Sequence, residues 1–283
     1  MTRSRLRLRV TRTIREVFRA TAAATRGVRA LVTKPKPKTL RDRIRARPQT
    51  SVGAYNSRRK KGCGHKNLVN ASFVAARARL GDVRTLAIDS WTFGTSHALL
   101  AAGATPSNIV VVNSGIDGVP STRVLCHDGA LLGVKVVVCK FGAYVARDTA
   151  PFGAVFADYT GTFLGSDDPE ACRPMRDLEA LFRCRFSDCV DGGRVLLAFS
   201  VCMRDRRMAA QRASIVAWVA RLAHSHRFVL EHSVLPVVYQ YNGLMLYFQF
   251  TLERVATLTP AQTQFYECVQ AVDTCAFPIE TVN

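Results

Sequence analysis

Short apolar runs alternate with amphipathic stretches through most of this chain, and that alternation limits the fold more than any other feature of the sequence. Helix-like segments separate several of the runs, including 68–80, 96–102 and a long one whose buried face extends from Met208 to Leu222. Apolar strands separated by helices pair in parallel, and helices then cover both faces of the sheet. The sequence therefore predicts an α/β fold with a mostly parallel, doubly wound sheet. The expected strands, of which the third should be buried, span residues 85–90, 108–113, 133–141, 153–159 and 195–201.

The last part of this body contains two strand-like runs with no helix between them. Residues 234–241 and 244–252 are joined at Asn242-Gly243, which is the strongest short-range signal for a tight hairpin. We therefore expect the sheet to end in an antiparallel pair. A parallel sheet with such an ending resembles the fold of the class I S-adenosylmethionine-dependent methyltransferases, in which the seventh strand runs against the others. The resemblance covers about residues 65–254 and implies S-adenosylmethionine as the cofactor.

Positive charge is concentrated at one end of the chain. Residues 1–62 contain 20 Lys and Arg against two acidic residues, a net charge of +18, whereas the remaining 221 residues contain 20 against 19, a net charge of +1. This distribution excludes a uniformly basic nucleic-acid-binding module and a wholly disordered chain. We expect three segments: a basic arm at 1–62, a methyltransferase-like domain at 63–254, and a C-terminal helix and tail at 255–283.

The basic arm has two specific interpretations, which are compatible with each other, and a third that gives it no function. Residues 1–32 combine Arg, Ser, Thr and Ala with a single acid, a composition typical of a mitochondrial transit peptide. A cluster further on is typical of nuclear localisation or of phosphate contact, and it consists of Arg58, Arg59, Lys60 and Lys61. The third interpretation is a solvated basic tail. The composition of the arm predicts a nucleic acid partner, with RNA favoured. It also predicts a mitochondrial location, with a nuclear or virion-associated location as the alternative.

Other classes of protein lack support in the sequence. Charged residues or His interrupt every apolar stretch before it is long enough to cross a bilayer, so we expect no membrane insertion. The nine cysteines show no paired spacing typical of zinc ligands, and we expect no metal site. The chain has no GxxxxGK[ST] phosphate loop, HExxH or GxSxG motif. The oligomeric state is not indicated by any pattern.

The loop after the first predicted strand is the expected place for the cofactor. In the methyltransferases this position holds an acidic residue followed by a glycine-rich turn. The resemblance implies that Asp89 accepts bonds from the ammonium group of S-adenosylmethionine, with Ser90, Gly94 and Thr95 beside it. Only Gly94 remains of the glycine-rich turn. The alternative for Asp89 is a residue that merely caps a turn.

The loop after the second predicted strand departs from the family pattern. The methyltransferases usually have a carboxylate there that accepts both ribose hydroxyls, whereas this chain has Asn113, with Asp117 four residues later. An amide can bond hydroxyls but brings no charge, and Asp117 substitutes for it only if the loop folds back. This departure leaves open an inactive methyltransferase-like domain.

The end of the fourth predicted strand, Asp158-Tyr159, resembles the catalytic position of the methyltransferases. In that family an acidic or amide residue and an adjacent aromatic meet the acceptor beside the methyl group. The resemblance implies that Asp158 orients or deprotonates the acceptor and that Tyr159 stacks on a base. The alternative is a strand-end turn, because Asp is an ordinary turn former.

Two functions from different classes remain. The first is an S-adenosylmethionine-dependent methyltransferase that acts on nucleic acid, with RNA favoured. The second is a catalytically inactive methyltransferase-like or structural RNA-binding protein, such as a viral coat or a ribosome-associated component. A coat domain should consist mainly of short antiparallel strands, so the alternation of strands and helices favours the enzyme.

Overall fold

The computed structural model describes the greater part of the chain after residue 62. The chain divides into two units, 1–59 and 60–283, and the first lies wholly outside the described residues. The predicted roles of the arm, including Arg58, Arg59, Lys60 and Lys61, therefore stay predictions. The described ranges are 63–89, 93–114, 119–159, 161–164, 173–203, 211–240, 244–260 and 262–264.

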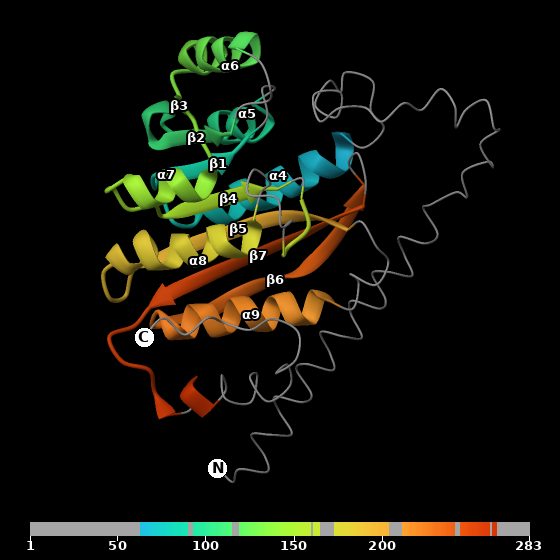
Figure 1. The fold of residues 1–283 in the computed structure, drawn as a ribbon. Coiled ribbons are helices and arrows are strands. Elements are labelled where there is room, and N and C mark those ends of the chain that lie inside the picture. The colour runs from blue at the N-terminus through green and yellow to red at the C-terminus, as the bar shows by residue number, and fades with distance from the viewer. Residues whose placement is uncertain are drawn as a thin grey trace, which may run out of the picture. The chain divides into compact units, whose positions relative to one another are not determined.

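Seven strands of the described residues form a single sheet in the order β3-β2-β1-β4-β5-β7-β6. The first five strands run parallel, and β7 runs antiparallel to both of its neighbours. In Figure 1 the arrow of β7 points the opposite way to that of β6. The strands are β1 Thr85–Ile88, β2 Ile109–Asn113, β3 Lys135–Val138, β4 Ala154–Asp158, β5 Arg194–Met203, β6 Phe228–Gln240 and β7 Leu244–Arg254.

This strand order confirms the predicted fold class. A parallel five-stranded sheet is followed by an antiparallel pair, and the reversed strand lies between β5 and β6 rather than at the edge. Pairing runs along the full length of β5, from Arg194↔Glu253 to Met203↔Leu244. The architecture is therefore the methyltransferase-like one that the resemblance implied.

Helices cover both faces of the sheet, as expected for a doubly wound fold (Figure 1). One apolar cluster joins α7, α8 and α9 to one face, and a second joins α4, α5 and α6 to the other. Two 3₁₀ turns, Pro106–Asn108 and Phe186–Asp188, precede β2 and β5. The helices are α4 Cys63–Ala78, α5 Gly94–Ala101, α6 Val119–Leu132, α7 Phe141–Arg147, α8 Pro174–Cys184 and α9 Gln211–Ser225.

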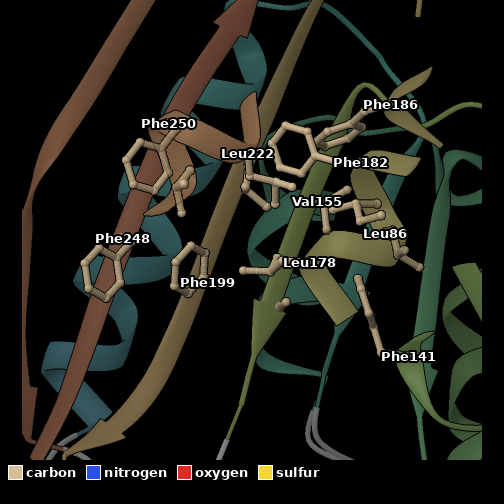
Figure 2. Close-up of a cluster of buried hydrophobic side chains, with 14 of the residues drawn as sticks. Leu86, Phe141, Val155, Leu178, Phe182, Phe186, Phe199, Leu222, Phe248 and Phe250 are labelled. Atoms are coloured by element: carbon tan, nitrogen blue, oxygen red, sulfur yellow. The ribbon is translucent and has the colours of Figure 1, made fainter. Parts of the chain in front are cut away.

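Aromatic side chains fill much of the core beneath α8 and α9. Figure 2 shows Phe199 of β5 beside Phe248 and Phe250 of β7, and the rings of Phe199 and Phe248 stack with centroids 4.9 Å apart. Trp218 of α9 is fully buried and meets Phe163 edge to face. Burial of several large rings on this face supplies a major part of the apolar stabilisation of the domain.

The sequence-based prediction for the third strand was wrong in extent and in burial. We expected a buried strand over 133–141, but β3 contains only Lys135–Val138 and its two end residues are exposed. Because β3 is the edge strand, it has β2 on one side and no strand of the described residues on the other. An apolar run of this length does not distinguish an edge strand from a central one. Phe141, the predicted end of the strand, instead begins α7.

Smaller differences concern the ends of elements. The first helix begins at Cys63 rather than 68, and β6 begins at Phe228 rather than 234. Helices α6 and α7 were not predicted. The Asn242-Gly243 turn lies outside the described residues, although Gln240 pairs with Leu244 across it.

The residues after β7 contain the start of a further helix. Thr259 and Gln262 form a capping box, in which the backbone N–H of each donates to the side chain of the other. Most of the predicted C-terminal segment 255–283 lies outside the described residues. Within the described ranges, no helix combines the length and the apolar character needed to cross a membrane.

Candidate functional site

Two carboxylates lie side by side at the carboxyl edge of the sheet. Strands β1 and β4 are paired up to Ile88↔Ala157, and Asp89 and Asp158 are the next residue of each strand. These are the strands at which the chain order reverses, with β2 and β3 on one side and β5 on the other. Ligands of open α/β sheets bind in the crevice at such a switch point. The sheet therefore brings both predicted acidic residues to the expected place.

Asp89 is 6% exposed and is anchored to the start of α5. Its Oδ2 accepts hydrogen bonds from the backbone N–H of Ser96 at 2.8 Å and from Ser96 Oγ at 2.9 Å. Burial raises the pKa of Asp89 above its ordinary value, against the opposing effects of the Ser96 bonds and of the nearby Lys66 ammonium. Part of the predicted turn-capping role is thus real, because the carboxylate holds the first turn of the helix.

The first turn of α5 forms the floor of this edge beside Asp89. Phe93 precedes the helix in a left-handed conformation with φ of 49°, and Thr95 Oγ1 donates to Asn70 Oδ1 of α4 at 3.3 Å. Gly94 is exposed, and a Cβ there would meet its nearest neighbour, Asn70 Nδ2, only at 3.8 Å. Protein packing therefore does not require a glycine at 94. The backbone N–H groups of Thr95 and Ser96 bond Asp89, so this carboxylate already caps the positive end of the helix dipole.

Asp158 is paired with a lysine to which the sequence analysis assigned no role. Lys66 Nζ of α4 lies 2.5 Å from Asp158 Oδ2, and the same ammonium lies 4.5 Å from the centroid of the Phe156 ring. Lys66, Asn70 and Phe73 follow each other at spacings of four and three, which places them on one face of the helix. A lysine on an otherwise buried face is the sequence signal that could have identified it.

Tyr159 does not lie at the acceptor position that the resemblance implied. Successive side chains of a strand point to opposite faces, so Tyr159 turns away from Asp158 into the core beneath α7 and α8. The residue is 2% exposed, and its ring meets Phe141 edge to face at 6.2 Å. A ring buried in this way cannot stack on a base, so the predicted stacking role is wrong in this structure.

The hydroxyl of Tyr159 instead acts on a half-buried carboxylate, Asp177 of α8, and favours its charged form. Asp177 also accepts from the backbone N–H of Gly142 at the start of α7, and it lies near Lys140. Burial raises the pKa of Asp177 to about 6, although these three groups favour the charged form. Asp177 therefore ties the loop after β4 to the helices above it.

This arrangement predicts a pH-dependent contribution to stability. The pKa of Asp177 is about 6 in the folded protein against 3.8 for the unperturbed group, so the folded state binds a proton first as the pH falls. The contribution of Asp177 to the free energy of unfolding should therefore increase by about 2 kcal/mol as the pH falls from about 7 to about 4. Urea unfolding of wild-type protein and of Asp177→Asn at both pH values measures it. An equal pH dependence in the two proteins would contradict the assignment.

The remaining predicted residues are placed as follows. Asn113 lies at the end of β2, and its Nδ2 donates to the backbone oxygen of Asp89 at 2.7 Å. Ser90 and Asp117 lie outside the described residues. Among the residues that the structure describes, no group of three His, Cys, Asp or Glu side chains is close enough to hold a metal ion.

The acidic side chains at this edge suit a ligand that carries positive charge. Asp89 and Asp158 offer carboxylate oxygens, and the first turn of α5 lies beside them. The cationic parts of S-adenosylmethionine, its ammonium and sulfonium groups, fit this set, because carboxylates attract positive charge. At the end of β2, where the resemblance implied a carboxylate that binds the ribose hydroxyls, this chain has Asn113.

Comparisons with known proteins give similarities of fold at low sequence identity. No family model and no curated protein matches the sequence. A "putative RNA methyltransferase" from Pyrococcus horikoshii is 10% identical with a TM-score of 0.45, over 68% of this chain and 84% of that one. A "putative hemolysin" from Streptococcus thermophilus is 17% identical with a TM-score of 0.46, over 76% and 75%. NSun6 from Pyrococcus horikoshii is 12% identical with a TM-score of 0.45, over 70% and 53%.

Proposed function

We propose that this protein is an S-adenosylmethionine-dependent methyltransferase that acts on nucleic acid, with RNA as the favoured substrate. The observation that carries the proposal is the pair Asp89 and Asp158, which occupy neighbouring register positions at the switch point of a methyltransferase-like sheet. One carboxylate belongs to the strand end expected to hold the cofactor and the other to the strand end expected to meet the acceptor. Their adjacency suits a reaction in which a cationic donor and an acceptor atom are brought together.

Each residue has a definite part in this reaction. The cofactor, when bound, supplies a methyl group on a positively charged sulfur that leaves as a neutral thioether. Asp89 would hold the ammonium group of its amino-acid portion. Asp158 would orient the acceptor and take the proton that the acceptor atom loses as its bond to the methyl carbon forms. Because the donor is already activated, alignment and exclusion of water supply most of the catalysis.

The preference for nucleic acid rests on the charge of the arm. Residues 1–62 carry a net charge of +18, whereas the rest of the chain carries +1. A polycationic segment binds phosphate backbones through release of counterions. The arm would therefore hold the substrate, and the acidic edge of the sheet would carry out the chemistry.

Two measurements on the full chain test the proposal. Calorimetric titration with S-adenosylhomocysteine should show binding, and incubation of the protein with RNA and S-adenosylmethionine labelled in the methyl group should transfer label to the RNA. Binding without transfer to RNA, but with transfer to DNA or protein, would retain the enzyme and change the substrate. Absence of both binding and transfer would contradict the proposal.

A second candidate is a catalytically inactive methyltransferase-like protein that binds RNA. Asn113 favours it, because this residue replaces the ribose-binding carboxylate and its amide is bonded to the backbone of Asp89. The same titration separates the two candidates. RNA binding by a protein that does not bind S-adenosylhomocysteine would favour the inactive form.

Asp89→Asn should weaken the binding of S-adenosylhomocysteine by about 1.5 to 3 kcal/mol, because it removes the charge from a hydrogen bond to the ligand's ammonium group. Asparagine retains an oxygen for the Ser96 N–H, whereas Asp89→Ala would also remove the cap of α5. Calorimetry measures the affinity, and thermal melting checks the fold. Asp188→Asn, a largely exposed carboxylate just before β5, is the matched control and should bind as wild type. Equal affinities of the Asp89→Asn variant and the wild type would remove Asp89 from the site.

A further inference from the structure

The ammonium of Lys66 is paired with one carboxylate of the site and acts electrostatically on the other. It forms the 2.5 Å ion pair with Asp158, and its positive charge partly offsets the rise in the pKa of Asp89 that burial causes. The Lys66 side chain is 14% exposed. A lysine with this little contact with water requires compensation for lost hydration. Asp158 and the face of the Phe156 ring both supply it.

Packing of α4 fixes this position. Phe73, two turns after Lys66, is fully buried and lies against Phe156 with ring centroids 5.1 Å apart. Asn70, one turn after Lys66, is 3% exposed and bonds Thr95 of α5. The helix is therefore attached to the sheet and to α5 directly below the site. Lys66 is held at the carboxylates by the fold and is not a mobile surface side chain.

A ligand cation that binds at this edge meets Lys66 directly. In the proposed reaction the donor sulfur lies next to the acceptor that Asp158 orients, and Lys66 contacts Asp158, so the sulfonium would come close to the ammonium. Like charges at such distances repel appreciably when partly shielded from water. A neutral ligand group in the same place would not be repelled.

We propose that Lys66 determines how strongly this site discriminates between the positively charged methyl donor and its neutral thioether product. The inference rests on the proposed function and specifies one residue of the same site. Repulsion of the sulfonium by Lys66 weakens binding of S-adenosylmethionine relative to S-adenosylhomocysteine. The repulsion disappears when the methyl group leaves and the sulfur becomes neutral, so Lys66 also favours transfer over retention of the donor.

The test compares two ligands that differ by one methyl group and one charge. Calorimetry with S-adenosylmethionine and with S-adenosylhomocysteine gives an affinity ratio for wild-type protein, Lys66→Met and Lys66→Arg. We expect Lys66→Met to shift the ratio in favour of the sulfonium by about five- to tenfold, and Lys66→Arg to keep the wild-type ratio. Lys135→Met, at the start of β3 and therefore at the opposite edge of the sheet, removes one positive charge elsewhere and should not change the ratio.

The outcomes distinguish failure of this inference from failure of the proposed function. If both ligands bind and Lys66→Met leaves the ratio unchanged, Lys66 does not sense charge and the proposed function stands. If neither ligand binds to the wild type, both proposals fail. Thermal melting checks each variant, and Lys66→Gln, which retains a donor for Asp158, replaces Lys66→Met if that variant unfolds early.

Discussion

Asp158→Asn is expected to reduce the rate of methyl transfer by roughly 10²- to 10⁴-fold, the range typical for loss of a group that accepts a proton in the transition state. Asparagine has nearly the same size as aspartate and can still accept a hydrogen bond from Lys66, but it cannot take up the proton of the acceptor. Binding of S-adenosylhomocysteine should persist, because the assigned contact of Asp158 is with the acceptor. Single-turnover transfer to RNA and calorimetry measure the two quantities.

The ion pair between Lys66 and Asp158 means that Asp158→Asn also changes stability, so a control variant is needed. Asp158→Asn leaves a poorly exposed ammonium without its carboxylate, so the variant should melt earlier than the wild type. Asp188→Asn also separates a carboxylate from a poorly exposed cation, Arg185, but far from the site, so it should lose some stability and retain activity. Wild-type turnover in a folded Asp158→Asn variant would reduce Asp158 to a structural partner of Lys66.

Deletion of residues 33–62 should lower the affinity for generic RNA by roughly 100-fold or more at low salt. The segment contains 11 Lys and Arg and one acid, Asp42. Each phosphate contact contributes roughly 0.7 to 0.9 to the slope of log affinity against log salt, so the slope should also flatten. Filter binding across a salt series measures both quantities.

The control for this deletion keeps the chain length and removes only the charge. Replacement of the 11 Lys and Arg of residues 33–62 by Gln should reproduce the loss of affinity. Full affinity with an unchanged salt slope in either variant would mean that the segment does not bind RNA. A transit peptide followed by a passive spacer would then be the better account of the arm.

Strand ends were the most useful guide from sequence to site. Asp89 and Asp158 each follow an apolar run, and in a parallel sheet the carboxyl ends of neighbouring strands meet at one edge. The sequence does not state which strands are neighbours. Pairing of β1 with β4, which are far apart in the chain, is what makes the two carboxylates adjacent.

The error over Tyr159 shows how adjacency in sequence misleads. Asp158 and Tyr159 are consecutive, and the family pattern suggested that both meet the acceptor. The two-residue period of a strand sends their side chains to opposite faces, so one lies at the site and the other in the core. The two-residue period is a property of any strand, so the sequence alone indicates that these two side chains separate.

By itself the sequence determined the class of the fold, the reversed strand, the separation of a basic arm from a near-neutral body, and the acidic residues at two strand ends. Local periodicity, turn chemistry and charge composition are properties of short segments, and they are readable without the rest of the chain. Only the tertiary structure placed Lys66 against Asp158, a contact across 92 positions, and brought Asp177 to Tyr159. The environment of a charged side chain depends on which distant elements surround it, and packing of α4 and α8 onto the sheet decides that.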